Sequence, residues 1–101
     1  MDIEATLDLH GLTQAEAHRA LGAFLHGSRS AGRLTVLVIT GKGGGKDLGS
    51  GRGGLVSGVL RDAVPRWLNE GPNRRMIRGF SFAAPKDGGE GALYVLLKRL
   101  G

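Results

Sequence analysis

Two residues near the start of the chain, Asp8 and His10, are of types that together can transfer protons. They lie in the segment Thr6–His10, whose alternation of polar and apolar residues predicts a strand with one buried face. Side chains two positions apart on a strand point to the same side, so the carboxylate would lie beside the imidazole. Histidine exchanges its proton near neutral pH, and an adjacent carboxylate orients the ring. The pair predicts general acid–base chemistry, but it also fits a solvated strand residue followed by one that helps the chain turn at Gly11.

A second feature is the glycine-rich segment 41–54, which contains eight of the 19 glycines. It joins a predicted strand to a predicted helix, and the unpaired N–H groups of a helix N-terminus attract anions. Its cations Lys42, Lys46 and Arg52 predict a phosphate clamp, with a solvated surface loop as the alternative. It is not a Walker A loop, because neither Ser nor Thr follows Lys46. Residues 49–54 match G-x-G-x-x-G by letter, but they follow the second strand instead of the first, which argues against a dinucleotide site.

The charge and the residue types of the chain limit the partners and sites that it can have. A formal charge of +5 and a pI near 10.5 favour a polyanion, either nucleic acid or an anionic membrane surface. The absence of cysteine excludes thiol catalysis, disulfides and thiolate zinc sites. His18 and His26 do not share a line on their predicted helix and have no third ligand, so no metal site is predicted from them. With aromatic residues at only 5%, RNA binding by base stacking is disfavoured.

The length of the chain predicts a single domain, and its hydropathy predicts that this domain lies in the cytoplasm. The 101 residues suffice for a single domain, and 41% hydrophobic with 23% charged residues is an ordinary globular composition. The longest apolar runs, such as Val36–Ile39, are too short to cross a bilayer. The segment Met1–Glu4 lacks the basic and apolar regions of a secretory signal. We expect a cytoplasmic protein with no membrane partner.

The first half of the chain predicts two strands around a helix. The helix should begin near Gln14, because Thr13 followed by Glu16 fits a capping box, and it should stop at Gly32. Residues at helical spacing predict its buried stripe: Ala17, Leu21, Phe24 and Leu25. The β-branched and apolar run 34–40 predicts a central strand buried on both faces.

The second half predicts a helix followed by a hairpin. The helix has apolar residues on one side, at Val56, Val59, Leu60, Ala63 and Trp67. Pro65 lacks an N–H donor, so a kink or a break is expected there. Residues 71–73 predict a turn, and segments 75–83 and 92–98 predict two strands joined by a loop over 85–91.

The predicted fold is therefore a two-layer α/β sandwich of order βαβαββ with a four-stranded mixed sheet. One face of the sheet should be only partly covered, and Asp8 and His10 would look out from it. The carboxyl ends of strands are where ligands bind in such sheets.

Three segments resemble motifs of the Smr (small MutS-related) domain. Leu7-Asp8-Leu9-His10-Gly11-Leu12-Thr13 resembles its opening motif, Leu-Asp-Leu-His-Gly. Ile39-Thr40-Gly41-Lys42-Gly43 resembles its second motif, usually written His-Gly-x-Gly-x-Gly. Residues 88–98 resemble its glycine-led last strand. Residues 63–68, which include the proline, resemble the second helix of stand-alone proteobacterial members. Because those members usually carry an N-terminal extension, we expect this chain to be the C-terminal domain of a longer protein.

The resemblance implies a fold similar to the C-terminal domain of bacterial translation initiation factor three. It also implies a nuclease that nicks DNA or cleaves RNA, in some members at ribosomes. The functional residues of the family correspond to Asp8 and His10 as catalytic groups, and to Gly41, Lys42 and Gly43 in the nucleic-acid-binding loop. At position 40, however, this chain has threonine where many members have histidine. If that histidine is a second proton-transfer group, this chain lacks it.

Two functions remain. In the preferred one, a monomeric endonuclease cuts RNA or structured DNA, with His10 as general acid or base, Asp8 setting its tautomer, and Lys42, Lys46 and Arg52 holding phosphates. On RNA the 2′-hydroxyl can attack without a metal, whereas on DNA water must attack and a divalent ion such as Mg²⁺ is expected at the carboxylate. No other cofactor is expected. The alternative, favoured by Thr40, is a module that binds RNA, branched DNA or the ribosome without cutting.

Overall fold

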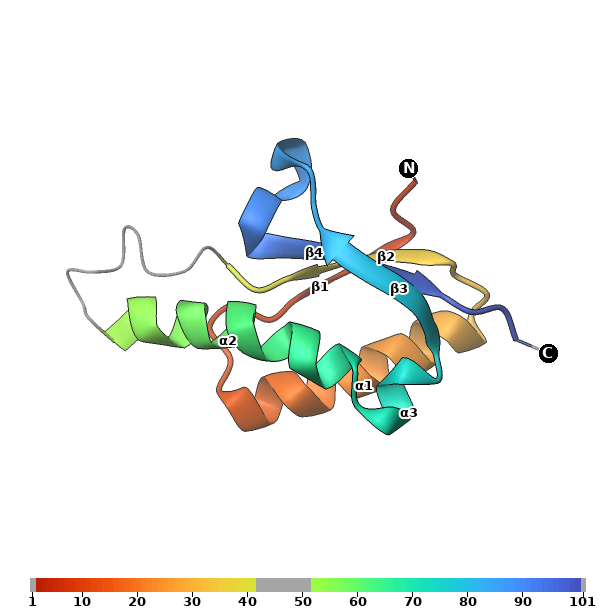
Figure 1. Ribbon diagram of the computed structural model, residues 1–101, viewed down its shortest axis with the longest axis horizontal. Coiled ribbons are helices and arrows are strands. Elements are labelled where there is room, and N and C mark those ends of the chain that lie inside the picture. Colours follow the sequence, from red (N-terminus) through yellow and green to blue (C-terminus); the bar gives the residue numbers. More distant parts are fainter. Residues whose placement is uncertain (1, 42–51, 101) are drawn as a thin grey trace.

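Four short segments rich in apolar residues form one sheet in the computed structural model, which describes residues 2–41 and 52–100. The strands are β1 (Ala5–Asp8), β2 (Thr35–Ile39), β3 (Ile77–Phe82) and β4 (Ala92–Leu97). Three helices lie against one face of this sheet (Figure 1): α1 (Gln14–Ser30), α2 (Arg52–Leu68) and the short α3 (Gly71–Arg74). The predicted two-layer sandwich is confirmed, with α3 as an addition.

The sheet has the strand order β1-β2-β4-β3 and is mixed, as predicted. β1 runs parallel to β2, with Asp8 opposite Ile39, and β4 runs antiparallel to β2, with Ala92 also opposite Ile39. β3 pairs with the outer edge of β4 through a register shift between Ile77 and Gly79. The carboxyl ends of β1 and β2 therefore meet the beginning of β4 at one end of the sheet.

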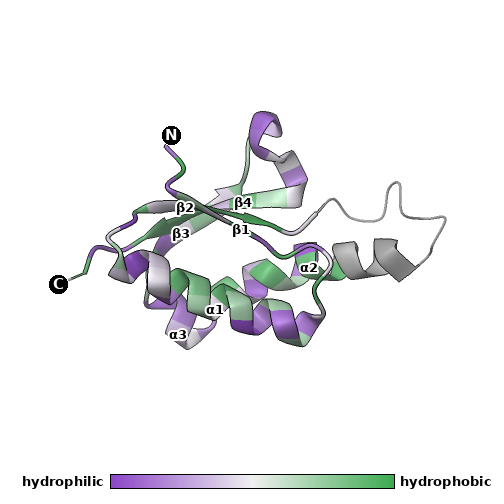
Figure 2. Cartoon of the chain, turned by 180° about the vertical axis from the view of Figure 1, so that it is seen from behind, coloured by the Kyte–Doolittle hydropathy of each residue, from purple (hydrophilic) through white to green (hydrophobic). Residues whose placement is uncertain are grey.

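The main core lies between the sheet and the helices, where apolar residues of both layers meet (Figure 2). Leu9, Leu21 and Leu60 are among its completely buried side chains. The other sheet face carries a smaller cluster around Leu37, Ala83 and Ala92, onto which Ile3 and Tyr94 pack. This face is thus partly covered, as the sequence predicted.

Helix α1 follows its sequence signals closely. The Thr13 hydroxyl accepts a hydrogen bond from the Glu16 N–H, and the Glu16 carboxylate accepts one from the Thr13 N–H, which completes the capping box. This hydrogen bond from the Thr13 backbone lowers the pKa of Glu16. The chain leaves the helix through Gly32, whose φ of +83° is a left-handed conformation that glycine adopts without strain.

Of the kink or break expected at Pro65, the break is wrong, because α2 continues through it to Leu68. A proline inside a helix removes one N–H bond, here the one to the carbonyl of Arg61. Val64 and Leu68 also belong to the buried side of α2. The predicted turn at 71–73 is instead a helical turn, α3, with a proline in its first positions.

The strand bounds differ by at most two residues from those predicted. β3 begins at Ile77 instead of residue 75, because the Arg75 N–H still donates to the Gly71 carbonyl of α3. The loop 85–91 is not irregular throughout, since it contains two short 3-10 turns, η2 (Pro85–Asp87) and η3 (Gly89–Gly91).

Candidate functional site

Asp8 and His10 lie in contact at the carboxyl end of β1. Asp8 Oδ1 accepts a hydrogen bond of 3.0 Å from the backbone N–H of His10, and the same oxygen lies 3.4 Å from His10 Nδ1. Both side chains are accessible, with 67% of the His10 side chain and 54% of the Asp8 side chain exposed. The carboxylate thus binds the backbone of the histidine and lies beside its ring, at a surface that a large substrate can reach.

A tight turn between β1 and α1 carries this pair. Leu9, between the two polar residues, is completely buried, and its N–H donates to the Ile39 carbonyl of β2. Directly after His10, Gly11 has a φ of +88°, which reverses the chain, and the Leu12 N–H returns to the Leu9 carbonyl. The capped N-terminus of α1 follows at Gln14. The backbone around His10 is therefore held on both sides by packed structure.

The end of β2 is attached to the last residue of η3. The Gly91 carbonyl accepts hydrogen bonds from the N–H groups of Thr40 and Gly41, at 2.8 and 3.0 Å. The Thr40 side chain is completely buried, and its hydroxyl also donates toward the Gly91 carbonyl, at 3.3 Å. Gly41 has a φ of +86°, so glycine is required there for the chain to leave the strand in this direction. Thr40 is therefore a structural residue, turned away from the solvent that His10 faces.

Two side chains, Tyr94 and Arg61, hold the loop 85–91 at this end of the sheet. The Tyr94 hydroxyl donates to Asp87 Oδ2 at 2.6 Å and accepts from the Ala84 N–H at 3.1 Å. The bond to Asp87 raises the pKa of Tyr94. On the helix side, Arg61 of α2 donates to Glu90 at 3.0 Å. These residues were not predicted, because no pattern of local spacing in the sequence distinguishes them from other residues of the same types.

Of the predicted site residues, the structure brings Asp8, His10 and Gly41 to one end of the sheet. Lys42, Gly43 and Lys46 lie outside the described residues, and of Arg52 only its place as the first residue of α2 is described. His18 belongs to a separate cluster: its Nε2 lies 2.7 Å from Glu70, and its ring lies 4.7 Å from that of Trp67.

The comparison with known families decides what kind of domain this is. The family model "Smr domain" matches residues 7–98. The chain belongs to the Smr family. This Smr domain is similar to the ribosome rescue factor SmrB of Shewanella baltica, with 33% identity over 91 residues. That match covers 90% of this chain and 43% of SmrB.

Further relatives include an endonuclease and two solved structures. The endonuclease MutS2 of Lactiplantibacillus plantarum is 28% identical over 96 residues, which make up 95% of this chain and 10% of MutS2. The crystal structure of the Smr domain of Thermus thermophilus MutS2 matches with a TM-score of 0.67 and 29% identity, covering 93% of this chain and 98% of that one. YdaL, a stand-alone small MutS-related protein from Escherichia coli, also has a TM-score of 0.67, at 30% identity over 93% of this chain and 64% of YdaL.

This Smr domain spans less than half the length of the first curated relatives it matches, 42% and 43%. The likeness to the initiation-factor domain stays a prediction. No helix in residues 2–41 and 52–100 combines the length and the hydropathy needed to cross a membrane.

The chemistry of the donors limits how a metal could bind. Within the described part of the chain, no group of three or more His, Asp or Glu side chains could hold a metal ion. Mg²⁺ keeps several water ligands and often binds through one or two carboxylates together with phosphates of the substrate. Asp8 is an accessible carboxylate, so it could bind Mg²⁺ together with phosphates of the substrate, but it could not do so as part of a site made by protein side chains alone.

Proposed function

We propose that this Smr domain is an endonuclease that cleaves RNA or structured DNA, with His10 as its proton-transfer group and Asp8 as the group that orients it. The observation that supports this is the contact of one Asp8 oxygen with both the backbone N–H and Nδ1 of the exposed His10. With Nδ1 facing the carboxylate, Nε2 is the nitrogen that a substrate would meet. The endonuclease named among the relatives, MutS2, supports the reaction class.

On RNA the attacking oxygen belongs to the substrate itself, and water is the only other reactant. His10 Nε2 would take the proton of the 2′-hydroxyl, whose oxygen attacks phosphorus while the bond to the 5′-oxygen breaks. The products would be a 2′,3′-cyclic phosphate and a 5′-hydroxyl; the latter would receive its proton from water, and the hydroxide left behind would take the proton from His10. Cations of the glycine-rich loop, Lys42, Lys46 and Arg52, together with the Gly41 and Gly43 backbone, would hold the phosphate and offset its developing charge. On DNA water replaces the 2′-hydroxyl, and Asp8 would share a divalent ion with the substrate.

The test is cleavage of labelled RNA and labelled branched DNA, with and without EDTA. His10→Ala should lower the cleavage rate by about 10²-fold or more and leave binding nearly unchanged, as expected for a proton-transfer group. His26→Ala is the matched control, because it removes an exposed histidine from the surface of α1. Asp8→Asn should lower the rate less than His10→Ala and shift its pH optimum. Equal cleavage by the wild type and His10→Ala would overturn the catalytic assignment.

A second candidate function is a module that binds nucleic acid or the ribosome without cutting. The burial of Thr40 favours it, since the second motif then offers no proton-transfer side chain at this position. The ribosome rescue factor among the relatives suggests the ribosome as one such partner. Binding to RNA without any cleavage, by the wild type and His10→Ala alike, would support this function over the first.

A further inference from the structure

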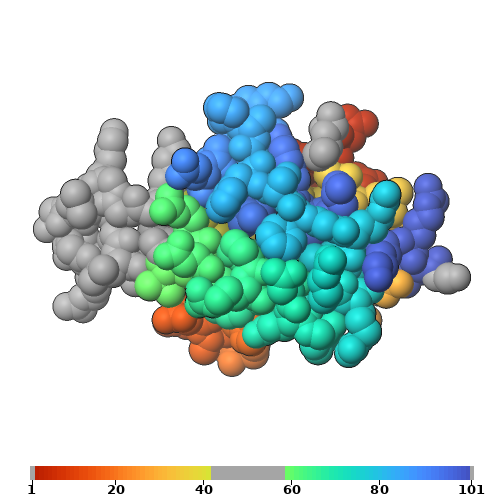
Figure 3. Space-filling model, in the orientation of Figure 1, coloured from red at the N-terminus to blue at the C-terminus, as the bar shows by residue number. Residues whose placement is uncertain are grey.

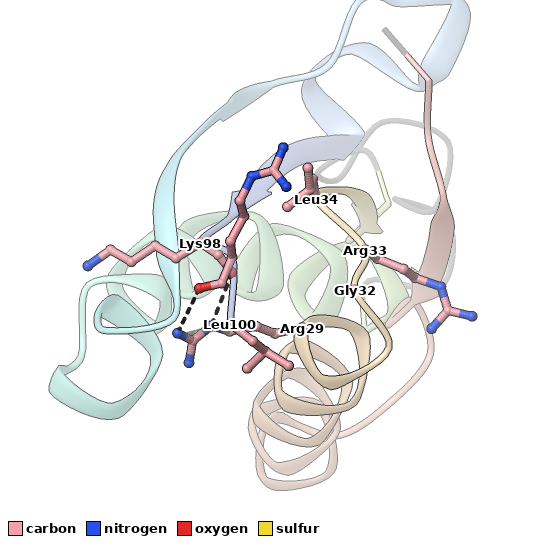
Figure 4. A pocket seen from close by; sticks show the side chains of 7 residues that line it. Arg29, Gly32, Arg33, Leu34, Lys98 and Leu100 are labelled. Carbon is pink, nitrogen blue, oxygen red and sulfur yellow. Dashed lines mark hydrogen bonds between the residues drawn. The ribbon is translucent and has the colours of Figure 1, made fainter.

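A hollow lined by cations lies at the end of the sheet opposite to His10. It has a volume of about 200 Å³ and is enclosed by the end of α1, the beginning of β2 and the chain after β4 (Figure 4). A second hollow of about 380 Å³ shares Leu34, Lys98 and Arg99 with the first. We define the basic groove by the five cations that line the two hollows: Arg29, Arg33, Arg78, Lys98 and Arg99. In the space-filling view, the C-terminal residues and the start of β3 meet at this end (Figure 3).

The cations of the basic groove are poorly balanced by acids. Three pairs lie within salt-bridge distance among the described residues, and none includes a groove cation. One carboxylate, Glu4, is near enough to Arg33 to be affected by its charge. The N–H groups of Leu34 and Thr35 both donate to Glu4, and these bonds, more than Arg33, lower its pKa. The Glu4 carboxylate is thus already hydrogen-bonded to the backbone at the start of β2.

Arg29 fixes one side of the basic groove through hydrogen bonds to the backbone. Its Nε donates to the Lys98 carbonyl at 3.1 Å and its Nη2 donates to the Arg99 carbonyl at 3.3 Å. These bonds hold the chain after β4 against the end of α1, although the residues are far apart in the sequence (Figure 4). A guanidinium has more N–H donors than these two bonds use, so Arg29 can both order the groove and contribute to an anion site.

The directions of the cations favour an extended ligand over a single ion. Figure 4 shows the side chains of Lys98 and Arg33 pointing away from each other, on opposite sides of the hollow. A lone phosphate would need these groups to converge, whereas a chain of phosphates can contact them in turn. Leu34 and the half-exposed Leu100 add apolar surface between the charges. A nucleic-acid strand, with phosphates separated by less polar sugars, matches this pattern.

We propose that the basic groove is a second nucleic-acid-binding surface, which holds the sugar–phosphate backbone of the strand that passes His10. This rests on the proposed function for the class of ligand, a nucleic acid, but not on cleavage. The five residues of β2 separate the groove from the candidate site, a distance of about 17 Å at the usual rise per residue of a strand. A nucleic acid that reaches both ends must therefore extend over roughly five nucleotides or more in a duplex.

The experiment measures how the affinity for labelled single-stranded RNA and for duplex DNA depends on salt. The variant is Arg78→Gln with Arg99→Gln, two exposed groove positions outside the candidate site. The matched control is Arg19→Gln with Arg66→Gln, which removes two exposed cations from the helix layer. Each lost phosphate contact lowers the slope of log affinity against log salt by about 0.7 for single strands and about 0.9 for duplex DNA. We expect a decrease of about 1.4 to 1.8 for the groove variant and no change for the control.

The outcomes separate this inference from the proposed function. A groove variant that folds, as shown by an unchanged thermal midpoint, and keeps the wild-type slope would overturn the inference and leave the groove to some other acidic partner. A wild type that binds neither nucleic acid would overturn both proposals. If the groove variant loses affinity while His10→Ala cuts as well as the wild type, the groove stands and the catalytic assignment fails.

Discussion

The hydroxyl of Tyr94 donates a hydrogen bond of 2.6 Å to Asp87 Oδ2 and so connects β4 to the 3-10 turn η2. The same hydroxyl accepts from the Ala84 N–H, so it holds both the start and the middle of the loop. The carbonyl of Gly91, the last residue of that loop, accepts hydrogen bonds from the N–H groups of Thr40 and Gly41. Tyr94 therefore helps, through the loop, to hold the end of β2 from which the glycine-rich segment continues.

Tyr94→Phe should loosen this end of the sheet without unfolding the domain. The ring of phenylalanine preserves the packing on Leu37 and Ala92, but the loop loses both hydrogen bonds to the hydroxyl. We expect faster amide hydrogen exchange at Thr40 and Gly41, with exchange at the core residue Leu21 changed less. Equal protection of the two amides in the wild type and the variant would show that the loop is held without Tyr94.

Stability at alkaline pH gives a second prediction about the same contact. The bond to Asp87 raises the pKa of Tyr94 above the ordinary value of 10.0, since ionised tyrosine could not donate it. The stabilisation is then fully present below pH 10.0 and is lost as the pH rises through the higher pKa of the folded state. Urea unfolding between about pH 8 and pH 11 should show a decrease that Tyr94→Phe lacks. Parallel pH curves for both proteins would contradict this coupling.

Local signals in the sequence were enough to predict most of the fold. The capping box at Thr13 and Glu16 and the left-handed Gly32 delimit α1, because each depends on residues a few positions apart. The alternation over residues 6–10 correctly predicts Leu9 inside and Asp8 outside. The same locality allowed a break at Pro65, which is wrong: the helix continues because the burial of Val64 and Leu68 outweighs one lost hydrogen bond.

The surroundings of the candidate site could not be predicted in this way. Arg61 and Glu90 are 29 positions apart, and only the packing of α2 beside η3 brings them to 3.0 Å. The basic groove joins Arg29 to carbonyls about 70 positions away. No local pattern marks such pairs, because they depend on the tertiary arrangement of elements that are individually ordinary.

Thr40→Val tests whether position 40 is structural. Valine has nearly the shape of threonine, so the buried site stays filled, while the bond to the Gly91 carbonyl is lost. We expect a decrease of about 1 kcal/mol in the free energy of unfolding and an unchanged cleavage rate. Thr6→Val, at an exposed position of β1, is the matched control and should stay within about 0.5 kcal/mol. A tenfold loss of cleavage by a folded Thr40→Val would instead place the hydroxyl in the reaction.

The glycine-rich segment is tested by removing its cations together, as Lys42→Gln, Lys46→Gln and Arg52→Gln. If each contacts a phosphate of duplex DNA, the slope of log affinity against log salt should fall by about 2.7, less whatever Asp47 already offsets. Binding to all sequences should weaken alike, because contacts to the backbone carry no base information.

The control for this last prediction replaces Arg19, Arg66 and Arg74, three exposed cations of the helices, and should leave the slope unchanged. The triple variant is then combined with the groove variant. If one strand contacts both surfaces, the two decreases in slope should add, because distant sites are independent. A solvated loop predicts no decrease from the triple variant, since its charges would stay hydrated in the free and bound states alike. A triple variant with wild-type affinity at low salt would rule out the phosphate clamp and leave the basic groove as the main contact with the nucleic acid.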